Sequence, residues 1–95
     1  MPAYIFANVE ITDPAAYEEY CRQVPAIIAA YGGRYLVRGC SVERLEGDQP
    51  LPRVVMLEFP DMARLKAFYN SAEYLPLLAI RHRAAKSHLL AVEGL

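Results

Sequence analysis

The sequence predicts a single α+β domain, spanning residues 1–95, whose elements follow one another in the order βαββαβ. Its 95 residues are enough for one hydrophobic core and too few for two. Segments in which apolar and polar residues alternate are separated by segments in which apolar residues recur every three or four positions. Hydrophobic residues make up 55% of the chain, more than a small domain can hide alone. We therefore expect a partner subunit as well.

Clear signals bound the first strand and the first helix. Residues Tyr4–Ile11 are rich in β-branched and aromatic side chains, as strands are. In the pair Asp13–Pro14, the aspartate is a typical N-cap and the proline suits the first helical turn. Apolar residues then recur at helical spacing as far as Tyr31, and Gly32–Gly33 predicts a left-handed C-cap. Pro25 predicts that this helix is kinked or divided into two pieces.

A hairpin is expected in the middle of the chain. Its first strand should be long, from about Arg34 to Glu46, with a bulge or bend near Gly39. Residues 47–52 are glycine, proline and polar residues typical of a turn. The strand Arg53–Phe59 follows and ends before a proline.

The second half of the chain predicts two helices and a last strand. Asp61 should cap a helix that runs to about Asn70. Ser71 should cap a shorter helix that extends towards Arg83 and is disturbed by Pro76. The stretch 87–93 is the fourth strand. Two β-α-β passes around a hairpin close most simply as a four-stranded antiparallel sheet of order 4-1-3-2, the ferredoxin-like arrangement.

Both faces of this sheet should be apolar. In the first strand Ile5 and Val9 lie on one side, and Tyr4 and Phe6 lie on the other. The strand 53–59 repeats this pattern, so the sheet should be buried twice. Helices cover one face only, and we expect a second copy of the chain to cover the other and form a homodimer.

Charge and composition exclude several classes of function. A net charge of −1 provides no field to attract nucleic acid or an anionic membrane. The apolar runs are too short to span a bilayer, and the first residues lack a secretory signal, so we expect a cytoplasmic protein. Cys21 and Cys40 are expected to be two buried thiols, and no motif calls for a metal or another cofactor.

A series of short motifs, in order along almost the whole chain, resembles the family known as domain of unknown function 1330. The motifs are Met1-Pro-Ala-Tyr4, Thr12-Asp-Pro14, Tyr31-Gly-Gly-Arg34, Leu36-Val-Arg-Gly39, Leu57-Glu-Phe-Pro60, and Tyr69-Asn-Ser71 followed by Glu73-Tyr74. The resemblance implies a dimeric α/β barrel, in which two ferredoxin-like sheets pack face to face. It implies no agreed activity, although the superfamily includes cofactor-independent monooxygenases, haem-degrading enzymes and muconolactone isomerase.

The haem-degrading relatives allow one comparison at residue level. They use an asparagine on the first strand, which Asn8 matches, and a histidine on the late helix. The position equivalent to that histidine falls near Leu78, whereas His82 comes a turn later. The chain also has no tryptophan, although that site uses one. The resemblance therefore disfavours haem degradation.

Glu58 is the strongest single candidate for a catalytic residue. It lies in a strand expected to be central, where a carboxylate needs a cation, a hydrogen bond or a proton. It could act as a proton acceptor in a pocket. The alternative, which the sequence favours, is a structural residue that pairs with an arginine such as Arg38 or Arg81 within the dimer.

The other candidates are predicted around the same pocket. Asn8 and Arg38 should contribute polar groups, with Tyr69 at the margin. Arg81 and His82 end the last helix, where cations suit the helix dipole. Alternatively, Arg81 holds a carboxylate and the catalytic candidate His82 moves a proton. Four tyrosines are expected in the core and could line a pocket for an aromatic ligand: Tyr17, Tyr20, Tyr31 and Tyr69.

Two classes of function remain open from the residues alone. The first is a cofactor-independent enzyme, similar to a monooxygenase or an isomerase, that acts on a small aromatic or carboxylated metabolite. The second is a non-catalytic dimer that binds a small ligand or another partner. The first requires an acid or base held in fixed geometry, which a sequence does not show.

Overall fold

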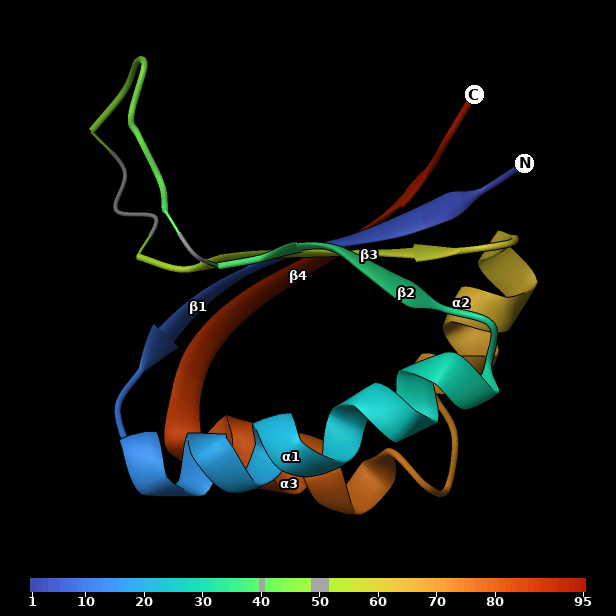
Figure 1. Cartoon of the computed structure of the whole chain (residues 1–95), viewed down its shortest axis with the longest axis horizontal. Coiled ribbons are helices and arrows are strands. Elements are labelled where there is room, and N and C mark those ends of the chain that lie inside the picture. Colours follow the sequence, from blue (N-terminus) through green and yellow to red (C-terminus); the bar gives the residue numbers. More distant parts are fainter. Residues whose placement is uncertain (40, 49–51) are drawn as a thin grey trace.

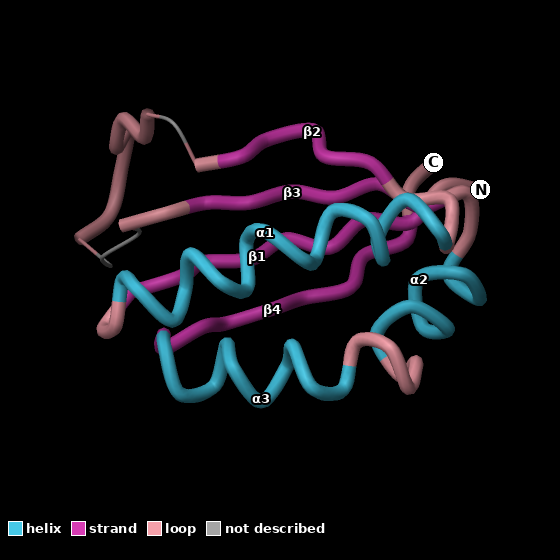
Figure 2. Tube along the Cα trace, turned by 60° about the horizontal axis from the view of Figure 1, so that its bottom comes forward, coloured by secondary structure: helices cyan, strands magenta, loops and turns pink. Residues whose placement is uncertain are grey.

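The computed structural model describes residues 1–39, 41–48 and 52–95, which form one four-stranded antiparallel sheet with helices on one side (Figure 1). The elements in chain order are β1 (Ala3–Ile11), α1 (Pro14–Ala30), β2 (Arg34–Arg38), β3 (Val54–Phe59), α2 (Met62–Tyr69), α3 (Leu75–Ala84) and β4 (Ala85–Glu93). The strand order is β2-β3-β1-β4, which confirms the predicted sheet order and the ferredoxin-like fold. In Figure 2, α1 and α3 run along the sheet and α2 lies at one end.

Helix α1 begins and ends where the sequence predicts. The Asp13 side chain accepts a hydrogen bond from the Ala16 amide at 3.3 Å, as an N-cap does. At the other end, Gly32 has a φ of 81°, and Gly33 donates its N–H to the Ile28 carbonyl at 2.9 Å. Pro25 lies inside α1, which continues without division through Ala30. Buried side chains on both sides of the proline pack against the sheet and hold one helix together.

The second strand is much shorter than the sequence predicts. β2 ends at Arg38, and residues 41–46 belong to no strand. Gly39 has a φ of 68°, a left-handed conformation that turns the chain out of the sheet. The irregularity in pairing lies between Tyr35 and Val37 rather than at Gly39. β2 and β3 form the expected antiparallel pair, while Cys40 and residues 49–51 of the expected turn lie outside the described part of the chain.

The caps of the later helices follow the sequence closely. The Asp61 carboxylate accepts from the Arg64 amide at 2.7 Å and starts α2. Ser71 Oγ accepts from the Tyr74 amide at 3.1 Å, but α3 itself begins only at Leu75. Pro76 therefore falls in the first turn of α3, where a missing N–H costs nothing and leaves the helix undisturbed.

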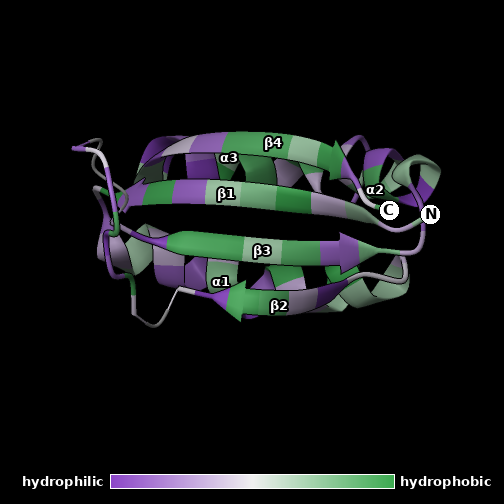
Figure 3. Cartoon of the chain, turned by 90° about the horizontal axis from the view of Figure 1, so that it is seen from above, coloured by the Kyte–Doolittle hydropathy of each residue, from purple (hydrophilic) through white to green (hydrophobic). Residues whose placement is uncertain are grey.

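The two faces of the sheet have different surroundings. Side chains that face the helices, such as Ile5 and Phe59, are 4% and 0% exposed. The opposite face, which we call the open face, carries Phe6 and Met56 and the exposed side chain of Leu90. Figure 3 shows this face, with hydrophobic residues in the middle of the strands. In one chain the expected second layer is therefore missing from the open face.

Candidate functional site

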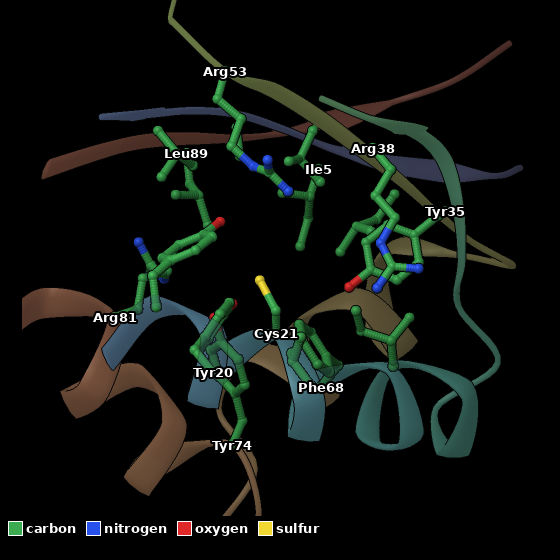
Figure 4. Close-up of a pocket in the computed structure, with 17 residues that line it drawn as sticks. Ile5, Tyr20, Cys21, Tyr35, Arg38, Arg53, Phe68, Tyr74, Arg81 and Leu89 are labelled. Carbon is green, nitrogen blue, oxygen red and sulfur yellow. The ribbon is translucent and has the colours of Figure 1, made fainter. Parts of the chain in front are cut away.

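A cavity of about 50 Å³ lies between the sheet and the helices, on the side opposite the open face (Figure 4). It is the candidate functional site. The lining side chains are Ile5, Ala7, Val9, Tyr17, Tyr20, Cys21, Val24, Ile28, Tyr35, Arg38, Arg53, Val55, Leu57, Phe68, Tyr74, Arg81 and Leu89.

Three guanidinium groups reach this cavity from three different parts of the fold. Arg38 comes from the end of β2, Arg53 from the residue before β3, and Arg81 from α3. Among the described residues that line the cavity, none is an aspartate, a glutamate or a histidine. The site therefore concentrates positive charge and favours an anion.

The burial of these arginines differs. Arg81 is 4% exposed, and its Nε has no hydrogen-bond partner in the described structure. Arg53 Nε is also buried and has no hydrogen-bond partner among the residues that the structure describes. Arg38 is exposed and lies at the mouth of the cavity. Figure 4 shows Arg38 and Arg81 on opposite sides, with Arg53 reaching in between them.

Two of the arginines pack on tyrosine rings. The Arg38 guanidinium carbon lies 4.5 Å from the centre of the Tyr35 ring, and that of Arg53 lies 5.6 Å from the centre of the Tyr17 ring. Gly39 makes room for this arrangement, because a Cβ there would lie 2.7 Å from Arg53 Cγ. The left-handed turn that ends β2 thus places the Arg53 side chain as well.

Uncharged hydroxyl and thiol groups complete the polar lining. The hydroxyl oxygens of Tyr20 and Tyr74 are 2.8 Å apart and share a hydrogen bond. Burial strongly raises the pKa of Tyr20, and it also raises the pKa of Tyr17 and of Tyr35. Burial likewise raises the pKa of the Cys21 thiol, whose sulfur points into the cavity (Figure 4). At neutral pH these groups are hydrogen-bonding neighbours of a ligand rather than bases.

The structure brings only two of the six predicted site residues together in this cavity, Arg38 and Arg81. Glu58 and Asn8 lie on the open face, because alternate residues of a strand point to opposite faces. Within one chain, Glu58 accepts a hydrogen bond from Arg34 Nε at 2.7 Å, and its ion pair among the described residues is with Arg34 rather than with Arg38 or Arg81.

Tyr69 and His82 lie outside the cavity as well. The Tyr69 ring is 5.8 Å from that of Tyr74 and borders a separate hollow of about 250 Å³ between α2 and β4. His82 is exposed, because the helix turns it away from its neighbour Arg81.

Sequence reasoning missed Arg53 and Tyr74 and treated Cys21 as an ordinary buried thiol. The available signal for Arg53 was its position at the start of a strand. In the structure its side chain lies against the left-handed Gly39. No group of three metal-ligating side chains occurs in the described residues, and none of their helices is long and apolar enough to cross a bilayer.

Comparisons with known proteins bear on the fold and on the family. A family model described as Domain of unknown function (DUF1330) matches residues 2–95. No curated protein matches the chain significantly.

Solved structures show the same fold. A protein of unknown function from Rhodopseudomonas palustris has 21% identity and a TM-score of 0.80, covering 99% of this chain and 82% of its own. SnoaB, a cofactor-independent oxygenase from Streptomyces nogalater, has 12% identity and a TM-score of 0.69, covering 99% and 93%. A dimeric ferredoxin-like protein of unknown function from Jannaschia sp. has 13% identity and a TM-score of 0.67, covering 99% and 100%. At these identities the likeness concerns the fold alone.

Proposed function

Because the chain belongs to the DUF1330 family, a domain of unknown function, we propose its activity from its cavity: a cofactor-independent enzyme that ionises a small aromatic metabolite. The observation that carries this proposal is the convergence of Arg38, Arg53 and Arg81 on a space with tyrosine rings and no carboxylate among its described lining residues. Aromatic rings suit a planar substrate, and the cations suit its negative charge.

The chemical role of the cavity is electrostatic. A nearby cation lowers the pKa of a bound phenol or enol, since it favours the charged form. The O–H bond breaks, the electron pair stays on the substrate oxygen, and the proton leaves to water at the mouth beside Arg38. The product is an electron-rich phenolate or enolate. Both isomerase-like proton shifts and monooxygenase-like reactions with dioxygen require such a species. SnoaB, which shares the fold, is named for an oxygenation without a cofactor.

Substrate entry requires movement at the mouth. An apolar cavity that holds benzene has a volume of ~150 Å³, whereas this one has about 50 Å³. Arg38 is exposed and packs on the Tyr35 ring. Such a contact is worth about 0.5–1 kcal/mol at an exposed site, so the side chain swings outward at low cost.

We propose that a second copy of the chain covers the open face. Phe6, Leu90 and Val92 lie side by side there, and Leu90 and Val92 are 61% and 49% exposed. The Jannaschia protein of the same fold is dimeric, which supports this assembly. The Glu58–Arg34 pair then belongs to the covered face as a structural ion pair. Each protomer keeps a complete cavity, because the cavity lies across the sheet from the interface.

The ionisation of 4-nitrophenol tests the proposed function. This phenol changes colour when it ionises, so absorbance measures its pKa with and without the protein. We expect the bound phenol to have a pKa lower by about one unit, equivalent to about 1.4 kcal/mol. Arg53→Gln should reduce the shift, and Arg34→Gln on the open face is the matched control that should not. An unchanged or raised pKa of the bound phenol would contradict the proposal.

One observation favours the non-catalytic alternative, a ligand-binding dimer. The described lining residues include no aspartate, glutamate or histidine that could act as a general base. Incubation of bound phenols and enols with the protein under air separates the two functions. If the protein is an enzyme, it consumes at least one of these compounds faster than the Arg53→Gln variant does. If it is a binding protein, all of the compounds remain unchanged.

A further inference from the structure

Arg81 is a buried cation that has no counter-charge among the described residues. Its side chain rises from the last turn of α3, and the residue is 4% exposed. No carboxylate of the described residues forms an ion pair with it; the described ion pairs are Arg22–Glu19 and Arg34–Glu58. Its Nε has no hydrogen-bond partner among the described residues. A buried charge without a counter-ion destabilises the fold, so an anion that satisfies it would bind strongly.

The surroundings of Arg81 are arranged for an anion. Burial opposes the charge of Arg81, but the Tyr74 hydroxyl lies close enough to favour the charged form and raise the pKa of the guanidinium. That hydroxyl shares a hydrogen bond with Tyr20 at 2.8 Å. When the Tyr74 oxygen accepts from Arg81, its own hydrogen points to Tyr20. The hydrogen of Tyr20 is then left for a ligand. Arg81 and Tyr20 both line the cavity, so the unpartnered Arg81 Nε and the Tyr20 hydroxyl are two donors for a ligand there.

We propose that this inner end of the cavity binds a carboxylate, so that the substrate is a small aromatic carboxylic acid whose ionisable oxygen lies towards Arg38 and Arg53. The inference rests on the proposed function and specifies its substrate class. A carboxylate has two oxygens, which match the guanidinium and hydroxyl donors at this end. Arg38 lies on the opposite side of the cavity from Arg81, and Arg53 reaches in between (Figure 4). One acidic group is thus held while the other is ionised.

Protection of Cys21 from alkylation measures occupancy of this site. The Cys21 sulfur points into the cavity, so a bound ligand blocks iodoacetamide (Figure 4). Cys21 and Cys40 fall in different tryptic peptides, so mass spectrometry follows Cys21 in the full chain. Benzoate and benzamide are the probes, because they have nearly the same shape and differ in charge.

We expect benzoate to protect Cys21 at concentrations at least about tenfold lower than benzamide, because a charge-assisted hydrogen bond is worth that factor or more. Arg81→Gln should remove the difference, and Arg81→Lys should keep part of it. The comparison of probes on the wild-type chain stands by itself if either variant fails to fold.

The outcomes separate this inference from the proposed function. Equal protection by benzoate and benzamide would overturn the carboxylate site. The proposed function would survive that result if 4-nitrophenol still showed a lowered pKa. If the Arg81→Gln variant loses the preference for benzoate and still lowers the pKa of 4-nitrophenol through Arg38 and Arg53, that result supports both the carboxylate site and the proposed function. A preference for benzoate that persists unchanged in a folded Arg81→Gln variant would place the carboxylate elsewhere and overturn the inference.

Discussion

The two faces of one sheet carry arginines in opposite circumstances. On the open face, Arg34 pairs with Glu58 at 2.7 Å, and its side chain is 69% exposed. On the helix-facing side, Arg81 is buried, and no carboxylate of the described residues lines the cavity around it. Arg34 comes from strand β2, whereas Arg81 reaches the helix-facing side from helix α3.

This difference supports the proposed division between ligand binding and assembly. An exposed arginine paired with a carboxylate is a common structural feature that contributes little energy. A buried arginine without a counter-ion is costly to the fold, and a bound anion offsets that cost. We therefore assign ligand chemistry to the helix-facing side and association between copies to the open face.

The largest expected effect comes from the packed side of the sheet. Phe59 is fully buried against Phe68, with ring centres 5.3 Å apart. Phe59→Ala should lower the free energy of unfolding by about 3–5 kcal/mol, measured by urea denaturation at a fixed protein concentration. A loss below about 1 kcal/mol would show that this face is not the core.

A charged substitution on the open face should change the oligomeric state. Leu90→Asp places a charge in the proposed interface and should change the mass measured by light scattering from two chains to one. Leu75→Asp is the matched control, because Leu75 is 65% exposed on α3, away from the open face. A dimer that survives Leu90→Asp, or that is lost equally in the control, would remove the open face as the interface.

Two glycines with left-handed backbones test how the cavity is placed. Gly39→Ala would bring a Cβ to 2.7 Å from Arg53 Cγ, whereas a Cβ at Gly47 would meet nothing within 4 Å. Both variants should lose about 1 kcal/mol of stability for the backbone conformation. Only Gly39→Ala should also reduce the lowering of the nitrophenol pKa. If the two variants bind the phenol alike, the contact with Gly39 does not position Arg53.

The ion pair of the open face should matter little by itself. In the monomeric Leu90→Asp background, Glu58→Gln should change the free energy of unfolding by about 0–1 kcal/mol, since a partly exposed pair contributes little. It should leave the ionisation of 4-nitrophenol unchanged. If the Glu58→Gln variant no longer promotes ionisation of the phenol, then Glu58 contributes to the site.

The smallest effect concerns Cys21. Because burial raises the pKa of its thiol, the reactive thiolate forms only at a pH above that of an ordinary cysteine. The rate of Cys21 alkylation should therefore reach half its maximum at a higher pH than that of a cysteine-containing peptide. A lower midpoint would show that the arginines outweigh burial.

Much of the fold was predictable because its signals are local. Asp13, Asp61 and Gly32 act through neighbouring backbone groups, so their effect is visible in a short stretch of sequence. The length of β2 was not predictable in this way. β2 extends only as far as β3 offers backbone hydrogen-bond partners, and the last pair is Arg38 with Val55.

The candidate site was harder to predict, because it depends on which face the helices cover. Alternation places Glu58 and Leu57 on opposite faces, but both faces carry apolar residues. The sequence therefore did not show that Glu58 lies across the sheet from the cavity. Arg81 and His82 are neighbours in sequence, and only the packing of α3 shows that the arginine is the buried one.

The most direct test of this assignment is methyl NMR during a titration with 4-nitrophenolate. Val55 and Leu89 border the cavity, while their sequence neighbours Val54 and Leu90 point to the open face. We predict that the methyl signals of Val55 and Leu89 shift with ligand concentration and that those of Val54 and Leu90 stay unchanged. Shifts confined to Val54 and Leu90 would place the ligand on the open face and contradict the account.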